Sequence, residues 1–171
     1  LLAFSTASMT LRRSIWASTS AFTTPSHLRS ARPSRSAISA ARCGLCHGVD
    51  GDSSSPLYPR LASQHHQYIA KQLADFKAGR RKSDTMASMA TDLTPEEMLA
   101  LGVYFEQKPT KPRPARDVEL AGVGRYIFHR GNESSGVAAC AGCHGENGHG
   151  TEQLPRLAGQ VPRYIEDQLR S

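Results

Sequence analysis

Long apolar segments are missing from this chain of 171 residues, whose mean hydropathy is −0.44. No uncharged run approaches the roughly 20 apolar residues that a bilayer-spanning helix requires, so we expect at most a peripheral association with membranes. Segments that alternate between apolar and polar residues, as half-buried strands do, are missing as well. The sequence therefore predicts an all-α protein made of short helices.

Acidic residues are absent from the first 42 positions, which contain six arginines: Arg12, Arg13, Arg29, Arg32, Arg35 and Arg42. These arginines explain the whole net charge of +6, because the other 15 basic residues are matched by 15 acidic residues. A nucleic-acid-binding domain would instead gather basic charge on a folded face. We therefore expect no nucleic-acid partner.

The same stretch has no clear structural pattern. Residues 1–41 are rich in Ser, Ala and Arg, a composition typical of organelle-targeting segments and of segments that bury too little apolar surface to fold. Positions 14–22 are too polar to form the apolar core of a secretory signal. A frame error that replaced the natural upstream sequence is a third interpretation, and the first residue, Leu1, is consistent with a fragment.

Only four cysteines are present, and all of them fall in two copies of one motif: Cys43-Gly44-Leu45-Cys46-His47 and Cys140-Ala141-Gly142-Cys143-His144. Cys-x-x-Cys-His is the attachment signature of c-type haem. Its spacing lets two thiols reach the two vinyl groups on one porphyrin edge and places the next imidazole beneath the iron. We therefore expect two haem c groups per chain, attached at Cys43, Cys46, Cys140 and Cys143, with the proximal ligands His47 and His144.

Two other chemistries use paired cysteines. A thioredoxin-like redox disulfide needs a strand–helix setting within a βαβ pattern, and no β-rich run precedes either motif. One zinc ion bound by four thiolates usually has its ligand pairs much closer than the 97 residues that separate Cys43 from Cys140. Haem attachment therefore fits the four cysteines better than either alternative.

A second repeat follows the haem motifs. The segment Pro59-Arg60-Leu61-Ala62-Ser63-Gln64 recurs as Pro155-Arg156-Leu157-Ala158-Gly159-Gln160. Self-similarity at this long period predicts duplicated domains rather than solenoid repeats. We place one domain at residues 42–107, a Pro-rich, polyproline-like linker at 108–116 and a second domain at 117–171.

Periodicity and capping predict three helices. Residues 66–78 carry apolar side chains at helical spacing, with Gly79 as the stop. The capping box at 94–97 opens a second helix, with proline at its first position. Asp117 can cap a third helix, which we expect to end at Gly131.

The first haem iron needs a second axial ligand, and methionine in that position raises the reduction potential. Met98 lies in the second predicted helix, where we expect it to fill the core. Met86 and Met89 lie in residues 83–91, which we expect to form a loop, and their spacing favours neither. Three histidines are rival ligands whose more ordinary place is the surface or a helix start: His65, His66 and His149.

Together these features resemble the dihaem cytochrome c4 family, which has two tandem class I cytochrome c domains, over about residues 42–171. The matching elements are the two haem motifs with their following glycines, both Pro-Arg-Leu-Ala-(Ser/Gly)-Gln segments, Tyr68 to Gly79, Met86-Ala87-Ser88-Met89 and the helix from Leu93 to Phe105. The resemblance implies that Met86 is the axial methionine, with Met89 as the alternative. It also implies that the carbonyls of Pro59 and Pro155 accept hydrogen bonds from His47 and His144.

The chain departs from the family pattern at both ends. The counterpart of Met86 would fall near position 182, past Ser171, so we expect a second domain truncated at its C-terminus. The helix that precedes the haem motif is recognisable at 118–130, whereas the first domain offers only the Ser/Arg tail and is expected to lack it. If the second iron had no sixth ligand, ligand binding or peroxidase-like activity would be an alternative function.

An iron closed by histidine and methionine has no position free for a substrate, so we expect an electron carrier rather than an enzyme. The resemblance implies one-electron transfer between a quinol-oxidising cytochrome bc-type complex and a terminal oxidase or similar acceptor, in the periplasm. The alternative that it leaves open is a dihaem cytochrome subunit of a dehydrogenase complex.

Overall fold

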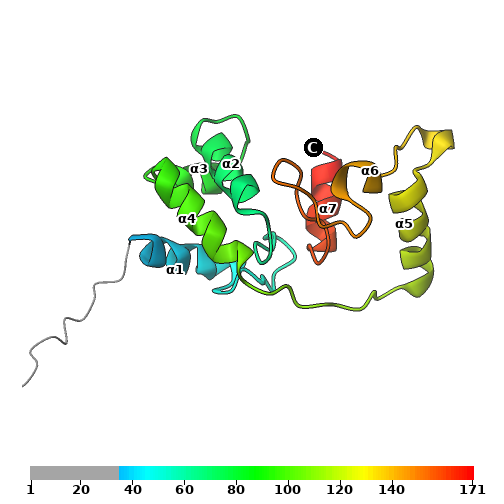
Figure 1. The fold of residues 1–171 in the computed structure, drawn as a ribbon, viewed down its shortest axis with the longest axis horizontal. Helices are drawn as coiled ribbons and strands as arrows, with labels where there is room; N and C mark the ends of the chain where they lie inside the picture. Colours follow the sequence, from blue (N-terminus) through cyan, green and yellow to red (C-terminus); the bar gives the residue numbers. More distant parts are fainter. Residues whose placement is uncertain (1–34) are drawn as a thin grey trace, which may run out of the picture. The chain divides into compact units, whose positions relative to one another are not determined.

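The structure, a computed structural model, describes the backbone from Arg35 to Ser171 and side chains from Ala41 onward; residues 1–34, most of the predicted tail, lie outside the described residues. Its elements are α1 (Arg35–His47), α2 (His66–Lys77), α3 (Asp84–Ala90), α4 (Pro95–Glu106), α5 (Val118–Arg130), η1 (Glu133–Ser135), α6 (Ala141–His144) and α7 (Pro162–Leu169) (Figure 1). The only β pairing in this part of the chain is an isolated bridge between Asn132 and Val137. The all-α prediction is confirmed.

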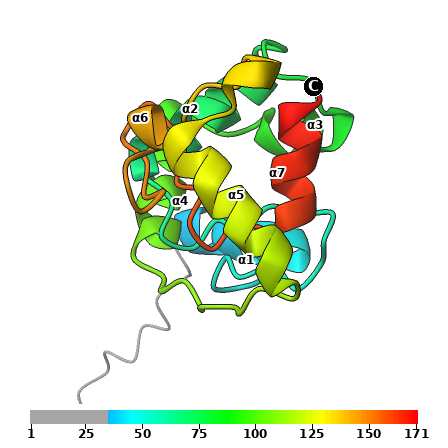
Figure 2. The same ribbon diagram turned by 90° about the vertical axis from the view of Figure 1, so that its right-hand side faces the viewer.

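Two modules follow one another along the chain. The first module comprises residues 35–107 with α1 to α4, and the second module comprises residues 117–171 with α5, η1, α6 and α7 (Figure 1). In the turned view of Figure 2, α5 faces the viewer. All the described residues, from Arg35 to Ser171, belong to one structural unit. Among the described helices, none combines the length and the apolar composition that crossing a bilayer requires.

Helix α1 corrects the expectation that the first domain lacks a helix before its haem motif. The helix runs without interruption into His47 and packs against α4. Positions 35–42 contain alanine and arginine, which are strong helix formers, and contact with α4 adds the tertiary support that a short helix needs. The first module therefore includes residues that precede the predicted boundary at 42.

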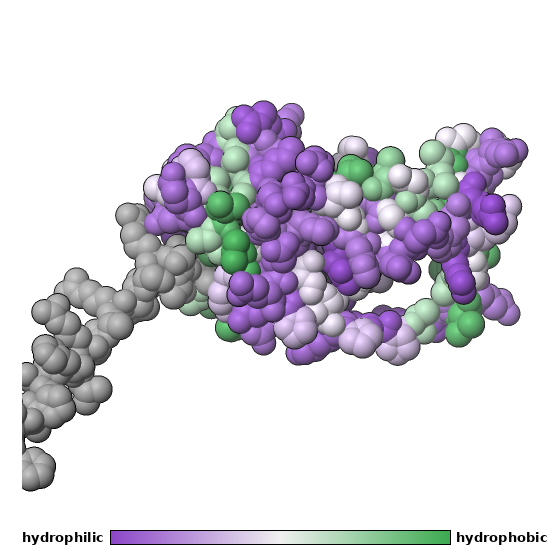
Figure 3. All heavy atoms as spheres, in the orientation of Figure 1, coloured by the Kyte–Doolittle hydropathy of each residue, from purple (hydrophilic) through white to green (hydrophobic). Residues whose placement is uncertain are grey.

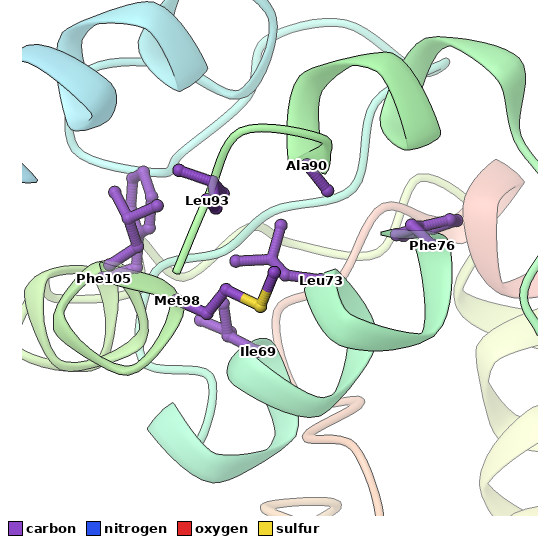
Figure 4. Close-up of a cluster of buried hydrophobic side chains, with 8 residues drawn as sticks. Ile69, Leu73, Phe76, Ala90, Leu93, Met98 and Phe105 are labelled. Atoms are coloured by element: carbon purple, nitrogen blue, oxygen red, sulfur yellow. The ribbon is translucent and has the colours of Figure 1, made fainter. Parts of the chain in front are cut away.

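The core of the first module lies where α2 packs against α3 and against α4 (Figure 4). Its buried members are Ile69, Leu73, Phe76, Ala90, Leu93, Met98, Leu101 and Phe105. Three of them come from the predicted helix at 66–78, which the structure contains as α2. Met98 is 4% exposed, so its predicted role in the core is confirmed.

The predicted helix ends are present. Thr94 and Glu97 form the capping box of α4, and the carboxylate of Asp117 accepts a hydrogen bond from the backbone N–H of Leu120 at the start of α5. Gly131 ends α5 with a φ of 73°, a left-handed conformation that costs glycine nothing.

Helix α3 corrects the prediction of a loop at 83–91. Its cap is Ser83, whose hydroxyl accepts a hydrogen bond from the backbone N–H of Met86 at 3.3 Å. Asp84 follows in the first turn, where a negative charge is favourable. A helix of seven residues is too short for periodicity to reveal it, but its cap was visible in the sequence.

Helix α5 of the second module exposes several large apolar side chains, among them Val118, Leu120, Val123 and Tyr126 (Figure 3). Among the described helices, α5 contacts only α6. The corresponding helix of the first module, α1, packs instead against α4.

Candidate haem sites

A cavity of about 960 Å³ is lined by residues of both haem motifs. Its volume lies at the upper end of the range of roughly 300–1,000 Å³ found for ligand and cofactor sites. Motif residues in the lining are Cys43, Cys46, His47, Cys140 and His144, and apolar residues include Leu73, Phe76, Leu101, Phe105, Phe128 and Leu157. An apolar cavity that presents two imidazoles and several thiols has the composition that a large, flat, iron-containing macrocycle requires.

All four cysteines are free thiols. Burial raises the pKa of the Cys43 thiol, although the neighbouring Arg42 opposes this shift. Within the described residues, no three His, Cys, Asp or Glu side chains converge as a metal site. Cys143, unlike the other three, is exposed.

The ring of His47 is held by the loop that follows the haem motif. Its Nδ1 lies 2.8 Å from the carbonyl oxygen of Pro59. Because a carbonyl can only accept, Nδ1 carries the proton and Nε2 keeps its lone pair for a metal. Burial lowers the pKa of His47 despite the Pro59 carbonyl, so the imidazole is neutral, as an iron ligand must be.

The second module repeats this arrangement. The Nδ1 atom of His144 lies 2.8 Å from the carbonyl oxygen of Pro155, so Nε2 is again the nitrogen available to a metal. Both histidines thus meet the requirement for a haem ligand whose far nitrogen is fixed by a hydrogen bond.

The same pair of backbone hydrogen bonds positions the proline carbonyl in each module. In the first module, the carbonyl of Gly51 accepts hydrogen bonds from the N–H groups of Leu61 and Ala62 at 2.8 and 3.1 Å. In the second, the carbonyl of Gly148 accepts from the N–H groups at 157 and 158 at 2.8 and 2.9 Å. Each contact closes the loop just after its proline, which brings the proline carbonyl over the histidine.

Met86 and Met89 both line the cavity, from helix α3. Met86 is partly buried and packs against the core of the first module, as Cys43 does. The sulfur of Met89 accepts a hydrogen bond from the guanidinium of Arg42 at 3.6 Å. The sulfur of Met89 therefore already has a polar partner, whereas Met86 packs against the apolar core.

Two of the three rival histidine rings, those of His65 and His66, have other partners. The Nε2 atom of His65 donates to the carbonyl oxygen of His149 at 2.9 Å. Nδ1 of His66 lies 2.7 Å from the carboxylate of Glu106. None of the three histidines is among the residues that line the cavity in the described structure.

Contacts between the modules were not foreseen from the sequence. The side chain of Gln160 forms two hydrogen bonds with the backbone of Arg60, and Gln64 forms the same two with the backbone of Arg156. The only signal for them was that Arg and Gln recur at matched places in the two Pro-Arg-Leu-Ala segments.

Comparison with known proteins is consistent with this site. The family model described as cytochrome c matches residues 36–107 and 128–171. The chain is 44% identical to cytochrome c4 of Thiocapsa roseopersicina over 130 residues, which cover 74% of this chain and 67% of that protein. It is 39% identical to cytochrome c4 of Azotobacter vinelandii, covering 76% of this chain and 67% of the relative. The chain thus spans about two thirds of the length of these relatives.

This chain is also similar in fold to a solved structure. The reduced recombinant cytochrome c4 from Pseudomonas stutzeri matches with a TM-score of 0.73 and 36% identity, over 79% of this chain and 76% of that one. A protein of Thiomonas intermedia named thiosulfate dehydrogenase electron acceptor is also similar, at 38% identity over 77% of this chain and 63% of its own length.

Proposed function

Because this chain belongs to the cytochrome c family, and within it to the dihaem cytochromes c4, we propose that it carries electrons one at a time between a quinol-oxidising cytochrome bc-type complex and a terminal oxidase or similar acceptor. One observation supports this proposal above the others. Two Cys-x-x-Cys-His motifs lie along one apolar cavity, each with its histidine fixed through Nδ1 on a proline carbonyl.

Each module supplies its own attachment set. We assign Cys43, Cys46 and His47 to the first haem c, and Cys140, Cys143 and His144 to the second. When bound, each haem supplies an iron that alternates between the ferrous and ferric states. The two thiols tether the macrocycle, the neutral imidazole holds the iron, and Pro59 or Pro155 fixes the imidazole ring.

We assign Met86 as the second axial ligand of the first haem. Its packing against the core and its place on the cavity wall support this choice over Met89, whose sulfur accepts from Arg42. A histidine–methionine pair leaves no position free for a substrate, so this site transfers electrons without bond chemistry.

The apolar lining has a function of its own. Side chains such as Leu101 and Phe105 are almost fully buried and keep water from the cavity wall. A site with few mobile dipoles needs little reorganisation when its charge changes by one. We place this carrier in the periplasm, where c-type cytochromes of this family act.

A second candidate function is that of an electron-accepting cytochrome for a dehydrogenase. The similarity to a protein named thiosulfate dehydrogenase electron acceptor favours this alternative. Stable co-purification with a dehydrogenase from the native host, together with reduction of the chain by that enzyme, would identify this role. Rapid oxidation by oxidase-containing membranes without such an enzyme supports the first role.

Haem stoichiometry tests the proposal at its base. The protein is co-expressed with a c-type maturation system and measured by its pyridine haemochrome spectrum. We expect two thioether-linked haems per chain, and one haem in a Cys140→Ser/Cys143→Ser double variant. A wild-type chain without covalent haem would overturn the proposal.

A further inference from the structure

One glutamine of each module forms hydrogen bonds with the backbone of the other module. Oε1 of Gln160 accepts a hydrogen bond from the backbone N–H of Arg60 at 2.8 Å, and its Nε2 donates to the carbonyl oxygen of Arg60 at 2.9 Å. Oε1 of Gln64 accepts from the N–H of Arg156 at 2.9 Å, and its Nε2 donates to the carbonyl oxygen of Arg156 at 3.1 Å. Each glutamine therefore binds the peptide backbone of the other module at the matched position.

The bound N–H groups lie in the peptide units that hold the haem-motif histidines. The N–H of Arg60 and the carbonyl of Pro59 are the two ends of one amide, and that carbonyl accepts the hydrogen bond from Nδ1 of His47. Two hydrogen bonds thus run in series from His47 through a single amide to Gln160. The second series runs from His144 through the Pro155–Arg156 amide to Gln64.

Hydrogen bonds in series through an amide strengthen one another. When the N–H donates to a glutamine oxygen, electron density shifts towards the carbonyl oxygen, which becomes a better acceptor, by perhaps 10–30% per bond. The low local dielectric favours this effect, since Gln64 is only 5% exposed and Arg60 only 8%. A stronger acceptor at Nδ1 makes an imidazole a stronger electron donor and stabilises a ferric iron over a ferrous one.

We propose that Gln160 and Gln64 are positioning residues that lower the reduction potential of the haem in the opposite module. This inference rests on the proposed function, because it takes His47 and His144 as iron ligands. Contact between the modules is then part of what sets each potential, and loss of that contact raises both potentials.

Glutamines that only held the two modules together would affect the reduction potentials differently. Gln168 also joins the modules, because its side-chain oxygen accepts a hydrogen bond from the guanidinium of Arg81. Gln168 has no contact with either Pro–Arg amide among the described hydrogen bonds, so a Gln168→Leu variant is a matched control for weakened association. Weaker association of the modules would change the reduction potentials of both haems together. The hydrogen bonds in series predict instead that each glutamine variant changes only the potential of the haem in the opposite module.

The test is a redox titration of Gln160→Leu, Gln64→Leu and Gln168→Leu, followed by NMR with ¹⁵N-labelled histidine so that each haem is assigned. We expect Gln160→Leu to shift the reduction equilibrium of the first-module haem about threefold towards the ferrous form, or about 28 mV at 59 mV per tenfold change. Gln64→Leu should do the same to the second-module haem. In each case the Nδ1–H signal of the affected histidine moves upfield in the reduced protein, and Gln168→Leu changes neither signal selectively.

A Gln160→Glu variant covers the case in which the leucine variant does not assemble. Its carboxylate cannot donate to the carbonyl oxygen of Arg60 as Nε2 does, but it still accepts from the N–H of Arg60 and is a stronger acceptor. The first-module potential and the Nδ1–H signal of His47 should therefore shift in the opposite direction. Unchanged Nδ1–H signals, or equal shifts of the two reduction potentials in every variant, would overturn the proposal. Failure of the proposed function is distinguishable, because it would appear as missing covalent haem in the wild type.

Discussion

The carbonyl oxygen of Pro59 lies 2.8 Å from Nδ1 of His47, and this contact decides which ring nitrogen is left for a metal. The haem motif alone places the imidazole but does not fix its rotation or its tautomer. The corresponding loop of the second module gives His144 the same hydrogen bond from Nδ1, to the carbonyl oxygen of Pro155. The geometry of the loop between motif and proline is therefore as much a part of the site as the cysteines.

Gly51 tests this dependence. Its φ is 72°, and a Cβ at this position would lie 2.7 Å from the backbone nitrogen of Ala62 and 2.8 Å from Cδ1 of Phe105. We expect Gly51→Ala to lower the free energy of unfolding by about 2–5 kcal/mol, since a left-handed conformation costs about 1–2 kcal/mol and overpacking about 1–3 kcal/mol. Urea unfolding of the haem-loaded protein measures the loss.

The matched control for Gly51 is Gly148, which holds the same place in the second module. Its φ is 64°, but a Cβ there would meet nothing closer than 3.4 Å. Only the conformational cost of about 1–2 kcal/mol should remain in Gly148→Ala. If the two variants lost the same free energy of unfolding, the crowding at Gly51 would be relieved without an energetic cost.

Met86 is the residue on which the assignment of the first iron depends. In Met86→Ala, the sulfur-to-iron charge-transfer band of the oxidised protein should disappear and the reduction potential of the first haem should fall, because a thioether ligand raises that potential. Absorption spectra and a redox titration measure both changes. A Met86→Ala variant with a normal low-spin spectrum and an intact band would show that another residue is the ligand.

Met89→Ala and Met98→Ala are the controls for Met86. Met89→Ala should keep the charge-transfer band, because the sulfur that it removes accepts a hydrogen bond from Arg42. Met98→Ala should also keep the band but lower the free energy of unfolding by about 2–5 kcal/mol, since Met98 is buried in the core.

Local chemistry made much of the site predictable from the sequence. The spacing of Cys43, Cys46 and His47 follows from the shape of the porphyrin, and the caps at Thr94 and Asp117 from the orphan N–H groups of a helix start. Helix α1 was missed because alanine and serine give no apolar periodicity before the motif. Its stability depends on contact with α4, which a single segment does not reveal.

Contacts between the modules are the part that sequence reasoning could not reach. The side chains of Gln64 and Gln160 each have one local partner, the backbone N–H of the next residue, but their other partners are backbone groups of residues 92 and 100 positions away. Backbone groups carry no sequence signature, so only the recurrence of Gln at the end of each repeat pointed to them. The pairing became visible once both loops were placed in space.

Asp52 provides a prediction about the buried charge of Arg60. The carboxylate of Asp52 is 6% exposed and lies 2.9 Å from Nε of Arg60, whose side chain is 8% exposed. Asp52→Asn leaves a buried guanidinium without its anion, which costs about 3–5 kcal/mol. Urea unfolding should show this loss, and we expect the Pro59 loop to be disturbed with it.

Lys111 is the control for the Asp52 variant. Its ammonium lies 3.6 Å from the same carboxylate, but its side chain is 69% exposed. Solvent screening limits such a pair to about 0–1 kcal/mol. If Lys111→Ala and Asp52→Asn destabilise the protein equally, the buried Arg60 pair is not the dominant contact of Asp52.

Asp75 predicts how stability depends on pH. Nζ of Lys71 and Nε of Arg80 donate to its carboxylate at 2.5 and 2.7 Å, and these hydrogen bonds, that of Lys71 foremost, lower the pKa of Asp75. A pKa that is lower in the folded than in the unfolded chain stabilises the fold above the unfolded value of about 3.9. This contribution is lost as the pH falls through the lower, folded value.

The Asp75→Asn variant should therefore be less stable than the wild type at pH 7, by about 1–2 kcal/mol for the lost charge-assisted hydrogen bonds. The difference should shrink once the pH falls below about 4, because the wild type then loses the same interactions. Urea unfolding of both proteins across this range measures it, with the exposed Asp92 as the comparison site: Asp92→Asn should stay within about 0.5 kcal/mol of the wild type at pH 7. A difference between Asp75→Asn and the wild type that stays constant down to the acid limit would mean that Asp75 acts through packing and not through its charge.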